Sequence, residues 1–572
     1  MINYKELIAE AISIAVESLS KDEIAGMIEI PTDEKMGDFA FPCFRLAKEL
    51  RKAPPMIAKD IAAKLADNKI LAKIEVVNAY VNMFLSREEF IYDVLKEVIS
   101  TQENFGRSDE GKGKKVLVEY SSPNIAKPFH IGHIRSTVIG NSIYKIYDFL
   151  GYDTERINHL GDYGTQFGKM IVSYRRWGNK EDVIKEPIKT LLNYYVKFHE
   201  ECERDPSLED EAREVFTKLE NGEPEEVELW RWFREESLKE FSKVYKMLGI
   251  EFDSYAGESF YSDKMERVVN MLKDDNLLKE SEGAQIVDLE EYNMSPALIM
   301  KSDGSTLYIT RDIAAAVYRK EHYNFYKNLY IVASQQNLHF KQWIKIIELM
   351  GNDWAKDCVH IPFGLVSLEE GTMSTRHGRV VYLEEVLNRA VEQTKQVIIE
   401  KDVNTENIEE TARQVGIGAV IFQELSNNRI KDYVFSWEKV LNFEGETGPY
   451  VQYTHTRAAS LLRNAGEETA KKAMNVDALK MKYIASDSGY ELAKLIYQFP
   501  QIVKEAGERY EPSIVTRHLV NVAQSFNHFY HDEHILVKNE EEKIAKLALV
   551  FAAKNTIKNG LGLLGMEVPE KM

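Results

Sequence analysis

Residues 114–158 read KKVLVEYSSPNIAKPFHIGHIRSTVIGNSIYKIYDFLGYDTERIN. The apolar run at 116–118 predicts a buried strand, and a loop rich in Ser, Pro and Asn follows it. Residues from about 132 to 150 predict a helix that ends at Gly151, and residues 154–158 predict a second strand. A strand, a helix and a strand joined by short links form a βαβ unit, so we expect a parallel sheet here.

The composition is ordinary for a globular protein. The 572 residues are 44% hydrophobic and 29% charged, which permits large cores and excludes global disorder. At about 150 residues per domain, the length predicts three or four domains. The 92 Asp and Glu outnumber the 73 Lys and Arg, and the net charge is −19. This balance excludes a general nucleic-acid coat or a polybasic membrane binder, so any polyanionic partner must meet a locally basic or neutral surface.

The three cysteines, Cys43, Cys202 and Cys358, stand far apart and form no CxxC pair. A thiolate zinc site is therefore not expected, and unpaired cysteines suit a reducing compartment. The N-terminus is amphipathic and lacks the continuous apolar core of a signal peptide. No run reaches the ~18 apolar residues of a membrane span. We expect a cytoplasmic protein.

Other regions differ in pattern. Residues 1–110 alternate helical and strand-like stretches, and the polar loop 105–113 is the best boundary near their end. Residues 181–240 hold 19 Asp and Glu against nine Lys and Arg, which predicts solvated helices of an insertion. Residues 446–572 are almost wholly helical in pattern and balance their charges. A polyanion would be repelled least at that end.

Two histidines three residues apart lie where the predicted helix of the βαβ unit begins. A helix start offers free N–H groups and a positive dipole end, which favour phosphate binding. Gly132 leaves room for a nucleotide, and His130 and His133 can donate to phosphate oxygens. The alternatives are two ordinary helix histidines, or half of a metal site that would need a third ligand.

His130-Ile131-Gly132-His133 after a strand resembles the HIGH signature of class I aminoacyl-tRNA synthetases. The longer string SSPNIAKPFHIGHIRSTVIG resembles the arginyl-tRNA synthetases in particular, and the resemblance extends along nearly all the chain. It implies an α/β fold with a Rossmann-like parallel-sheet catalytic domain that carries an insertion. An α+β N-terminal domain and an all-α C-terminal domain would complete the chain.

The resemblance also implies domain boundaries. Residues 1–110 would recognise tRNA, and residues 111–370 would perform catalysis, with the acidic insertion at about 172–300. Residues 371–445 would hold a signature loop and contact the tRNA stem. Residues 446–572 would bind the anticodon. The acidic stretch 181–240 has no assigned task beyond spacing.

Residues 371–379, GTMSTRHGR, resemble the second signature of the family, KMSKS. Such a mobile loop can close over a triphosphate and stabilise charge moving onto pyrophosphate. The implied ATP-binding residues here are Met373, Ser374 and Arg376. Both lysine positions are threonine, so the cation must come from Arg376, Arg379 or Lys127. We prefer Lys127, because its loop can reach the phosphates from the other side.

Strand-like pattern returns at 307–310 and 328–333, and polar residues lie beside both. An arginine substrate presents a planar guanidinium, which carboxylates and neutral acceptors match. The resemblance places Tyr308 and Asp312 on the guanidinium. It places the remaining arginine-binding residues, Glu119, Asn124 and Gln336, on the rest of the amino acid, with Gln336 preferred over Gln335. Taken alone, Arg311-Asp312 is more often an ion pair at a helix start.

Residues 444–457, EGETGPYVQYTHTR, resemble the entry to the family's helical anticodon-binding domain. Aromatic rings can stack on splayed bases, and arginine can pair with phosphate. The candidates for tRNA binding are Tyr450, Tyr453, His455 and Arg457. The alternative is a helix that packs these residues in a core. The HLGDYGTQ segment at 159–166 matches a family motif, and it is equally consistent with a glycine turn.

The implied reaction has two steps. The arginine carboxylate attacks the α-phosphorus of ATP, and the arginyl group then passes to the terminal ribose of tRNA, first to the 2′-OH. The catalytic residues would be His130, His133 and Lys127. ATP would enter with Mg²⁺ as a substrate complex, without a protein-bound metal. The implied partners are L-arginine and its tRNA, with no membrane, and we expect a monomer.

Three other interpretations remain open. The first is a class I synthetase for another amino acid, which would not need acids and a tyrosine around a cation. The second is a nucleotidyltransferase for a smaller substrate, whose chain is usually shorter. The third is a non-catalytic RNA-binding relative, which the missing signature lysines alone would favour.

Overall fold

The computed structural model describes residues 2–16, 18–302, 308–368, 381–400, 407–440, 442 and 445–572. Internal contacts divide the chain into two compact units, which are considered separately. The first contains residues 1–105, 454–500 and 521–559, and the second contains residues 106–453, 501–520 and 560–572. None of the described helices combines the length and the hydrophobicity that crossing a bilayer requires.

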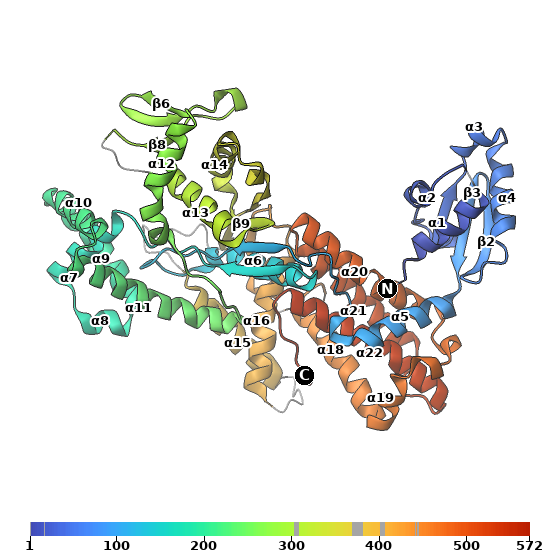
Figure 1. The fold of residues 1–572 in the computed structure, drawn as a ribbon. Coiled ribbons are helices and arrows are strands. Elements are labelled where there is room, and N and C mark those ends of the chain that lie inside the picture. Colours follow the sequence, from blue (N-terminus) through green and yellow to red (C-terminus); the bar gives the residue numbers. More distant parts are fainter. Residues whose placement is uncertain are drawn as a thin grey trace. The chain divides into compact units, whose positions relative to one another are not determined.

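The first unit begins with a three-stranded antiparallel sheet in the order β1-β3-β2, flanked by helices (Figure 1, blue). Its elements are α1 (Tyr4–Ala15), α2 (Lys21–Met27), β1 (Phe39–Pro42), α3 (Leu46–Leu50), α4 (Pro54–Leu65), β2 (Leu71–Val77), β3 (Tyr80–Leu85) and α5 (Arg87–Thr101). Val81 and Met83 alternate on β3 and are fully buried, while Ile57 and Ile61 bury one face of α4. This pattern of periods two and 3.6 gives the predicted α+β region its core.

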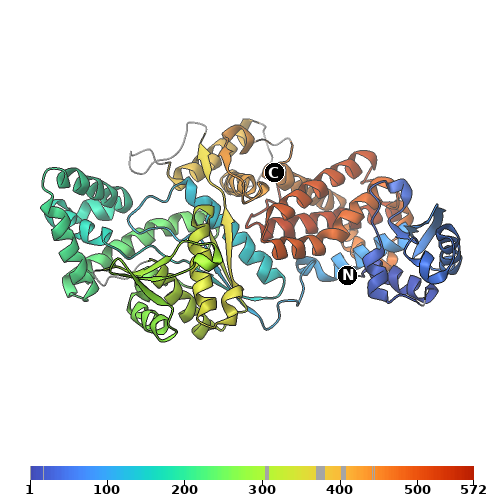
Figure 2. The same ribbon diagram turned by 90° about the horizontal axis from the view of Figure 1, so that it is seen from above.

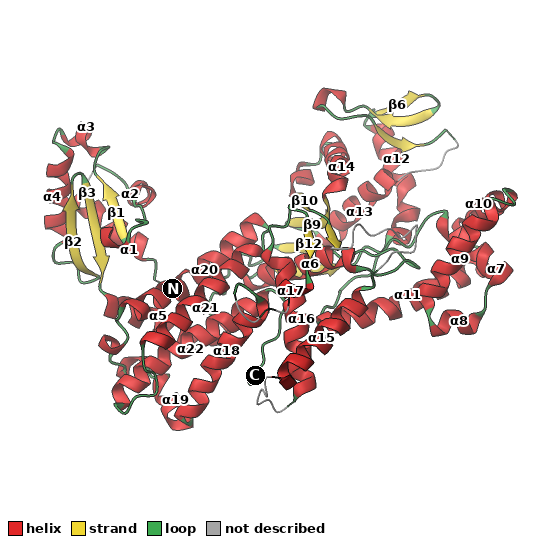
Figure 3. Ribbon diagram, turned by 180° about the vertical axis from the view of Figure 1, so that it is seen from behind, coloured by secondary structure: helices red, strands yellow, loops and turns green. Residues whose placement is uncertain are grey.

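The C-terminal stretch is helical, as predicted (Figure 3, red). Its helices are α18 (Gly448–Ala465), α19 (Glu467–Ala473), α20 (Asp487–Arg509), α21 (Ser513–Asp532) and α22 (Glu540–Leu563). Within the first unit, Phe90 of α5 packs on Tyr490 with ring centroids 5.4 Å apart. Tyr4 packs on Tyr497 at 5.9 Å. The N-terminal segment and part of the C-terminal helices therefore share one core.

The second unit is built on a parallel sheet in the order β10-β9-β4-β5. Its strands and the helices that connect them are β4 (Lys115–Glu119), α6 (Ile134–Phe149), β5 (Asp153–Ile157), α13 (Tyr308–Tyr323), β9 (Lys327–Ala333), α14 (Asn337–Leu349) and β10 (Cys358–Phe363). The predicted βαβ unit is confirmed, and Gly151 after α6 takes a positive φ of 85°.

Helices cover this sheet and bury its side chains. Helix α6 contacts β4, β5 and β9. Helices α13 and α14, green to yellow in Figure 2, contact each other. A cluster of buried residues joins Leu117 of β4 and Tyr330 of β9 to Ile313 of α13 and Trp343 of α14. Successive residues of a strand point to opposite faces, so this cluster occupies one side of the sheet only.

The strand predicted at 307–310 is wrong, because residues 308–310 begin α13, while 307 lies outside the described residues. Ile309, Ile313 and Val317 recur every four residues, and all three are buried. A window of four residues could not distinguish this helical period from a strand. The strand predicted at 328–333 is confirmed as β9.

The acidic insertion is helical, as predicted, and its helices group together (Figure 1). They are α7 (Gln166–Trp177), α8 (Lys180–Lys185), α9 (Pro187–Cys202), α10 (Ser207–Glu220) and α11 (Pro224–Leu248). Ion pairs such as Lys169–Glu209 at 2.6 Å connect them. Helix α12 (Met265–Asp274) and an antiparallel sheet follow, with strands β6 (Leu278–Ser281), β7 (Ala284–Val287) and β8 (Ala297–Met300).

A smaller group of elements follows β10. They are β11 (Val366–Leu368), α15 (Leu383–Glu400), α16 (Ile408–Ser426), β12 (Tyr433–Phe435) and α17 (Trp437–Val440). Strands β11 and β12 pair in parallel, and α15 packs along α16.

Candidate active site

The carboxyl ends of β4 and β9 form the topological switch point of the parallel sheet. The chain leaves β4 for β5 on one side and later returns to β9 on the other. In sheets of this kind, ligands bind in the crevice outside the strand ends at that point. Glu119 ends β4, and Gln336 follows the end of β9 by three residues. The structure therefore brings these two predicted residues to the same edge of the sheet.

The loop from β4 to α6 has a strained backbone that its neighbours hold in place. Ser121, Ser122 and Ala126 have positive φ values of 69°, 45° and 58°, which cost free energy in residues with side chains. The Ser121 hydroxyl lies 2.8 Å from the Tyr245 hydroxyl, and the Ala126 N–H donates to Ser237 Oγ at 3.1 Å. Both partners belong to α11. This helix therefore helps to set the shape of the loop between β4 and α6, which is called the catalytic loop below.

Both signature histidines use Nδ1 as an acceptor. The N–H of Gly132 donates to His130 Nδ1 at 3.0 Å, and the N–H of His130 donates to His133 Nδ1 at 3.1 Å. The ring centroids lie 4.1 Å apart. A neutral imidazole that accepts at Nδ1 carries its proton on Nε2. His133 Nδ1 also lies 3.3 Å from His130 O, but the shorter contact is the one in which it accepts. In this tautomer each ring has an Nε2–H that can donate to a ligand.

The surroundings of the histidines favour this neutral form. Burial, together with the neighbouring His130, lowers the pKa of His133 to about 3. Burial also lowers the pKa of His130. At neutral pH the pair therefore donates hydrogen bonds without contributing positive charge.

Lys127 provides a cation in the same loop. Its side chain is half-buried, and burial lowers its pKa, while the charge of Glu258 acts in the opposite direction. Within the part of the chain that the structure describes, no ion-pair partner lies within 4 Å of the Lys127 ammonium. A lysine so placed is available to an anionic ligand.

Glu119 is already bound to an arginine of the chain. Arg319, which is fully buried on α13, donates to Glu119 Oε2 at 2.5 Å. It also donates to Tyr261 Oη and His159 Nδ1, both at 3.3 Å. The sequence prediction did not include this network. It fixes the Glu119 carboxylate in place and neutralises its charge.

Asp312 and Tyr308 lie one turn apart on α13. Tyr308 is exposed, and Asp312 Oδ2 lies 2.5 Å from His339 Nε2. His339 is a second residue that the sequence prediction missed. A signal was present, because His339 comes three residues after Gln336 at the start of α14. His339 connects Asp312 of α13 to α14, the helix that follows β9.

Glu258 is a third residue that the prediction missed. Its Oε2 lies 3.1 Å from Arg311 Nη1. Burial raises the pKa of Glu258 to about 7, the charges of Asp312 and Asp162 raise it too, and those of Arg311 and Lys127 lower it. Asp312, predicted to bind arginine, and Lys127, predicted to bind phosphate, therefore both act on the charge of Glu258. A strongly shifted carboxyl in such a place is a mark of functional sites.

The predicted ligand Asn124 is exposed, and its backbone pairs with Gly161 in the loop after β5. A Cβ at Gly161 would lie 2.3 Å from Asn124 Oδ1, so a side chain there would displace the Asn124 amide. Asp162 beside it is fully buried and accepts from Arg234 Nε at 2.9 Å and the Ser259 N–H at 2.8 Å. The 159–166 segment thus contacts the backbone of Asn124 and of Ser259, the residue after Glu258.

The predicted signature loop, with Met373, Ser374 and Arg376, lies outside the described residues. Its C-terminal flank is described and adjoins the signature histidines. The N–H of Ile131 donates to Val381 O at 3.1 Å, and the N–H of Leu383 donates to Phe129 O at 2.9 Å. The chain therefore returns from the signature segment directly beside the histidine loop.

Comparisons with known proteins agree with this geometry. Residues 94–437 match the family described as tRNA synthetases class I (R), catalytic domain. Residues 3–85 match the arginyl tRNA synthetase N terminal domain, and residues 451–572 match the DALR anticodon binding domain. An arginine–tRNA ligase of Clostridioides difficile (strain 630) is 57% identical over 572 residues, which is the whole of both chains. The chain belongs to the arginyl-tRNA synthetase family.

Solved structures support the same assignment. The crystal structure of arginyl-tRNA synthetase from Plasmodium falciparum matches with a TM-score of 0.79 and 26% identity, covering 99% of this chain and 98% of that one. The arginyl-tRNA synthetase of Thermus thermophilus, at 24% identity, has the same fold, with a TM-score of 0.81 over 100% of both chains. The expected class I catalytic fold and ligase activity of an arginyl-tRNA synthetase are confirmed.

The predicted tRNA-binding residues of this synthetase differ in exposure. Tyr453 is 41% exposed, and Tyr450 is half-buried. His455 is fully buried, which argues against the predicted contact with a base. Arg457 donates to Asn527 and lies over the ring of Tyr530, 5.2 Å from its centroid. Helical packing thus uses part of the segment that was predicted to bind tRNA.

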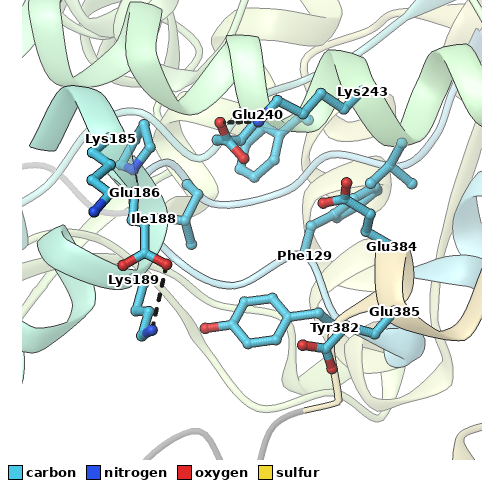
Figure 4. Close-up of a pocket in the computed structure, with 13 residues that line it drawn as sticks. Phe129, Lys185, Glu186, Ile188, Lys189, Glu240, Lys243, Tyr382, Glu384 and Glu385 are labelled. Carbon is cyan, nitrogen blue, oxygen red and sulfur yellow. Dashed lines mark hydrogen bonds and ion pairs between the residues drawn. The ribbon is translucent and has the colours of Figure 1, made fainter. Parts of the chain in front are cut away.

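A cavity of about 560 Å³ lies beside the loop between β4 and α6 of the synthetase (Figure 4). Phe129 of that loop lines it together with Tyr382 and charged residues of α9, α11 and α15. Lys243 pairs with Glu240 at 2.6 Å across its wall. None of the predicted site residues lines this cavity, so it is separate from the switch-point crevice.

Proposed function

We propose that the switch-point crevice of this synthetase activates arginine, with Asp312 and Glu258 on the guanidinium and His130 and His133 on the ATP phosphates. The chain is an arginine–tRNA ligase by family, so the overall reaction joins arginine to tRNA at the expense of ATP. One observation carries the assignment of residues. The charges of Asp312 and Lys127 both act on the Glu258 carboxyl, which lies 3.1 Å from Arg311, the residue next to Asp312 on α13.

In the first step, the arginine carboxylate attacks the α-phosphorus and pyrophosphate leaves. The Nε2–H groups of His130 and His133 donate to phosphate oxygens as negative charge builds up in the transition state. Gly132 lets the nucleotide approach the backbone. No side chain acts as a covalent nucleophile, so the rate comes from positioning and charge stabilisation. ATP brings Mg²⁺, which its own phosphates hold, as a substrate complex.

Lys127 supplies the positive charge that the threonines of the signature loop cannot. Its lowered pKa arises from burial rather than from a cationic neighbour. It stays protonated in the presence of a triphosphate, because an adjacent anion favours the charged form. Met373, Ser374 and Arg376 would close over the phosphates from the other side. The leaving pyrophosphate is thus stabilised by the loop that precedes α6.

The acids select arginine over lysine. A guanidinium has five N–H donors in one plane, which two carboxylates and the Tyr308 hydroxyl can accept together. A lysine ammonium would leave some of these acceptors unpaired, and a site built to pair all of them discriminates against it. Glu119, Asn124 and Gln336 hold the amino-acid end. Because Arg319 neutralises Glu119, Glu119 contributes a fixed acceptor rather than free negative charge.

The second step transfers the arginyl group to the terminal ribose of the cognate tRNA, first to the 2′-OH by class resemblance. The N-terminal segment 1–110 and the helices of 446–572 would recognise the tRNA. The second unit would perform the chemistry within 111–370, with 371–445 for the signature loop and stem contact. Tyr450, Tyr453 and Arg457 are the proposed contacts. We place the enzyme in the cytoplasm as a monomer.

Charging of bulk tRNA with each amino acid in turn tests this function. We expect ATP-dependent charging with arginine and at least 1,000-fold lower kcat/KM with lysine, since polar recognition discriminates by about that factor or more. Glu258→Gln should raise the arginine KM, whereas Glu321→Gln, an exposed acid on α13, should not. Charging with another amino acid, or equal use of lysine, would contradict the proposal.

A further inference from the structure

Arg311 directly precedes Asp312 on α13. Asp312 contacts His339, whereas Arg311 contacts Glu258. Its side chain is only 6% exposed. The guanidinium lies over the ring of Tyr163, 4.5 Å from the centroid, and Nη1 lies 3.1 Å from Glu258 Oε2. The Tyr163 hydroxyl donates in turn to Glu220. The guanidinium also lies over the ring of Tyr308, 5.5 Å from the centroid, so Arg311 is held by two rings and one carboxylate.

Hydrogen bonds hold the backbone around Glu258, and an ion pair with Arg311 holds its side chain. The N–H of Glu258 donates to Leu160 O at 2.9 Å, and the next N–H, of Ser259, donates to the buried Asp162. Among the described residues, Arg311 is the cation within 4 Å of the Glu258 carboxylate. The direction of that carboxylate therefore depends on Arg311.

The contact is an ion pair without hydrogen-bond geometry. Nε and Nη1 of Arg311 make no hydrogen bond to the described residues, although both are buried. Burying a guanidinium costs free energy unless a nearby anion compensates its charge. The Glu258 carboxylate provides that anion, and the pair leaves the remaining oxygen of Glu258 open to a ligand.

We propose that Arg311 is a positioning residue for arginine selection, which holds Glu258 as a carboxylate directed at the substrate guanidinium. This inference rests on the proposed role of Glu258 in the arginine site. Arg311 itself need not touch the substrate. It sets the charge and the direction of the acid that does.

The charges around Glu258 show why the loss of Arg311 should change the pKa of Glu258. Arg311 and Asp312 face it from α13, Asp162 faces it from the loop after β5, and Lys127 faces it from the catalytic loop. Two anions thus oppose two cations. Burial already raises the pKa of Glu258 to about 7, and loss of Arg311 would raise it further because one cation would remain against two anions. Glu258 would then be neutral at pH 7 and would attract the guanidinium weakly.

The test measures the arginine KM and the ATP KM between pH 6.5 and 9, by charging bulk tRNA. Arg311→Gln should raise the arginine KM about tenfold or more at pH 7, because each unit of pKa shift changes the ionised fraction up to tenfold. The KM should recover as pH rises and Glu258 ionises. Arg311→Lys keeps a cation and should stay within a few fold of the parent. The ATP KM should change less than twofold.

Matched variants separate this role from a structural one. Glu258→Gln should raise the arginine KM at every pH, without recovery, and adding Arg311→Gln to it should change the arginine KM little further. Arg267 is exposed and pairs with Glu321, which lies on α13 as Arg311 does. Arg267→Gln should leave both KM values at the parent level. If Arg311→Gln does not fold, as judged by circular dichroism, Arg311→Lys decides the outcome: an arginine KM more than about tenfold above the parent would overturn the inference, because the cation is still present.

Three results would overturn the inference. One is a parental arginine KM and pH profile in Arg311→Gln. Another is a lower arginine KM, which would mean that Arg311 occupies the substrate site. The third is an equal KM increase from Arg311→Gln in the presence and absence of Glu258. If Glu258→Gln itself has a parental KM, then the assignment of Glu258 under the proposed function fails as well.

Discussion

The guanidinium of Arg135 donates from Nε to Glu424 Oε1 at 2.6 Å, and the two side chains are 0% and 1% exposed. Arg135 also donates to the carbonyls of Gly364 and Lys431 at 2.9 and 2.8 Å. Arg135 follows the signature histidines on α6, and Glu424 lies on α16. This buried pair therefore connects the catalytic helix to the segments on either side of the signature loop.

Breaking that pair should unfold the second unit more easily. Arg135→Met leaves the Glu424 carboxylate buried without its partner, which costs about 3–5 kcal/mol. We expect a fall of several degrees in the first thermal transition. Arg267→Met, which breaks an exposed pair with Glu321, should cost at most about 1 kcal/mol. Equal transitions in the two variants would contradict this account.

Lys127→Ala should slow adenylate formation more than it weakens arginine binding. Lys127 is the cation proposed to stabilise the leaving pyrophosphate, and such groups contribute about 10²–10³ in rate. Rapid-quench measurement of the adenylate in the presence of tRNA gives the rate, and the arginine dependence gives the affinity. Lys243→Ala, in the cavity beside Phe129, serves as the control. An unchanged rate in Lys127→Ala would remove Lys127 from the mechanism.

Asp312→Ala should raise the arginine KM by about 30-fold or more, because a hydrogen bond to a charged group contributes about 1.5–3 kcal/mol and its loss leaves the guanidinium unmatched. The ATP KM should change little, since Asp312 lies on the amino-acid side of the crevice. Steady-state charging with varied arginine measures both effects. Glu321→Ala, an exposed acid farther along α13, is the comparison, and an equal arginine KM in both variants would count against Asp312.

His133 should not titrate between pH 5 and 8. Burial lowers the pKa of His133 to about 3, so the ring stays neutral in this range. An unfolded histidine takes up a proton near pH 6.5, so this site lowers the stability of the fold as pH falls from 6.5 toward 3. Nitrogen NMR of histidine-labelled protein, with His133→Asn for assignment, should show an Nε2–H tautomer with constant shifts. A midpoint near pH 6.5 would show that the ring is not desolvated.

The sequence predicted the parts of the fold that depend on local periodicity. The strand at 116–118 and the helix after His133 were found because apolar runs and a helix start adjoin each other along the chain. The same reasoning failed at residues 307–310, Leu-Tyr-Ile-Thr, because four residues fit both a strand period and a helix period. Only the wider spacing to Ile313 shows the helix.

The rest of the site depends on long-range contacts that no local pattern records. Glu258 acquires its role from Arg311 and Asp312, which follow it only after the β6–β8 sheet. Arg319 neutralises Glu119 because α13 packs against β4's end, which is a tertiary event. Burial of His455 likewise depends on the helices around it. Such residues can be assigned only when the fold is known.

A crystal structure with L-arginine and a non-hydrolysable ATP analogue tests the central claim most directly. The account predicts the substrate guanidinium between the carboxylates of Asp312 and Glu258, and the α-phosphate within hydrogen-bond distance of the Nε2 atoms of His130 and His133. Ligands bound elsewhere, with neither group beside Asp312 or His133, would contradict it.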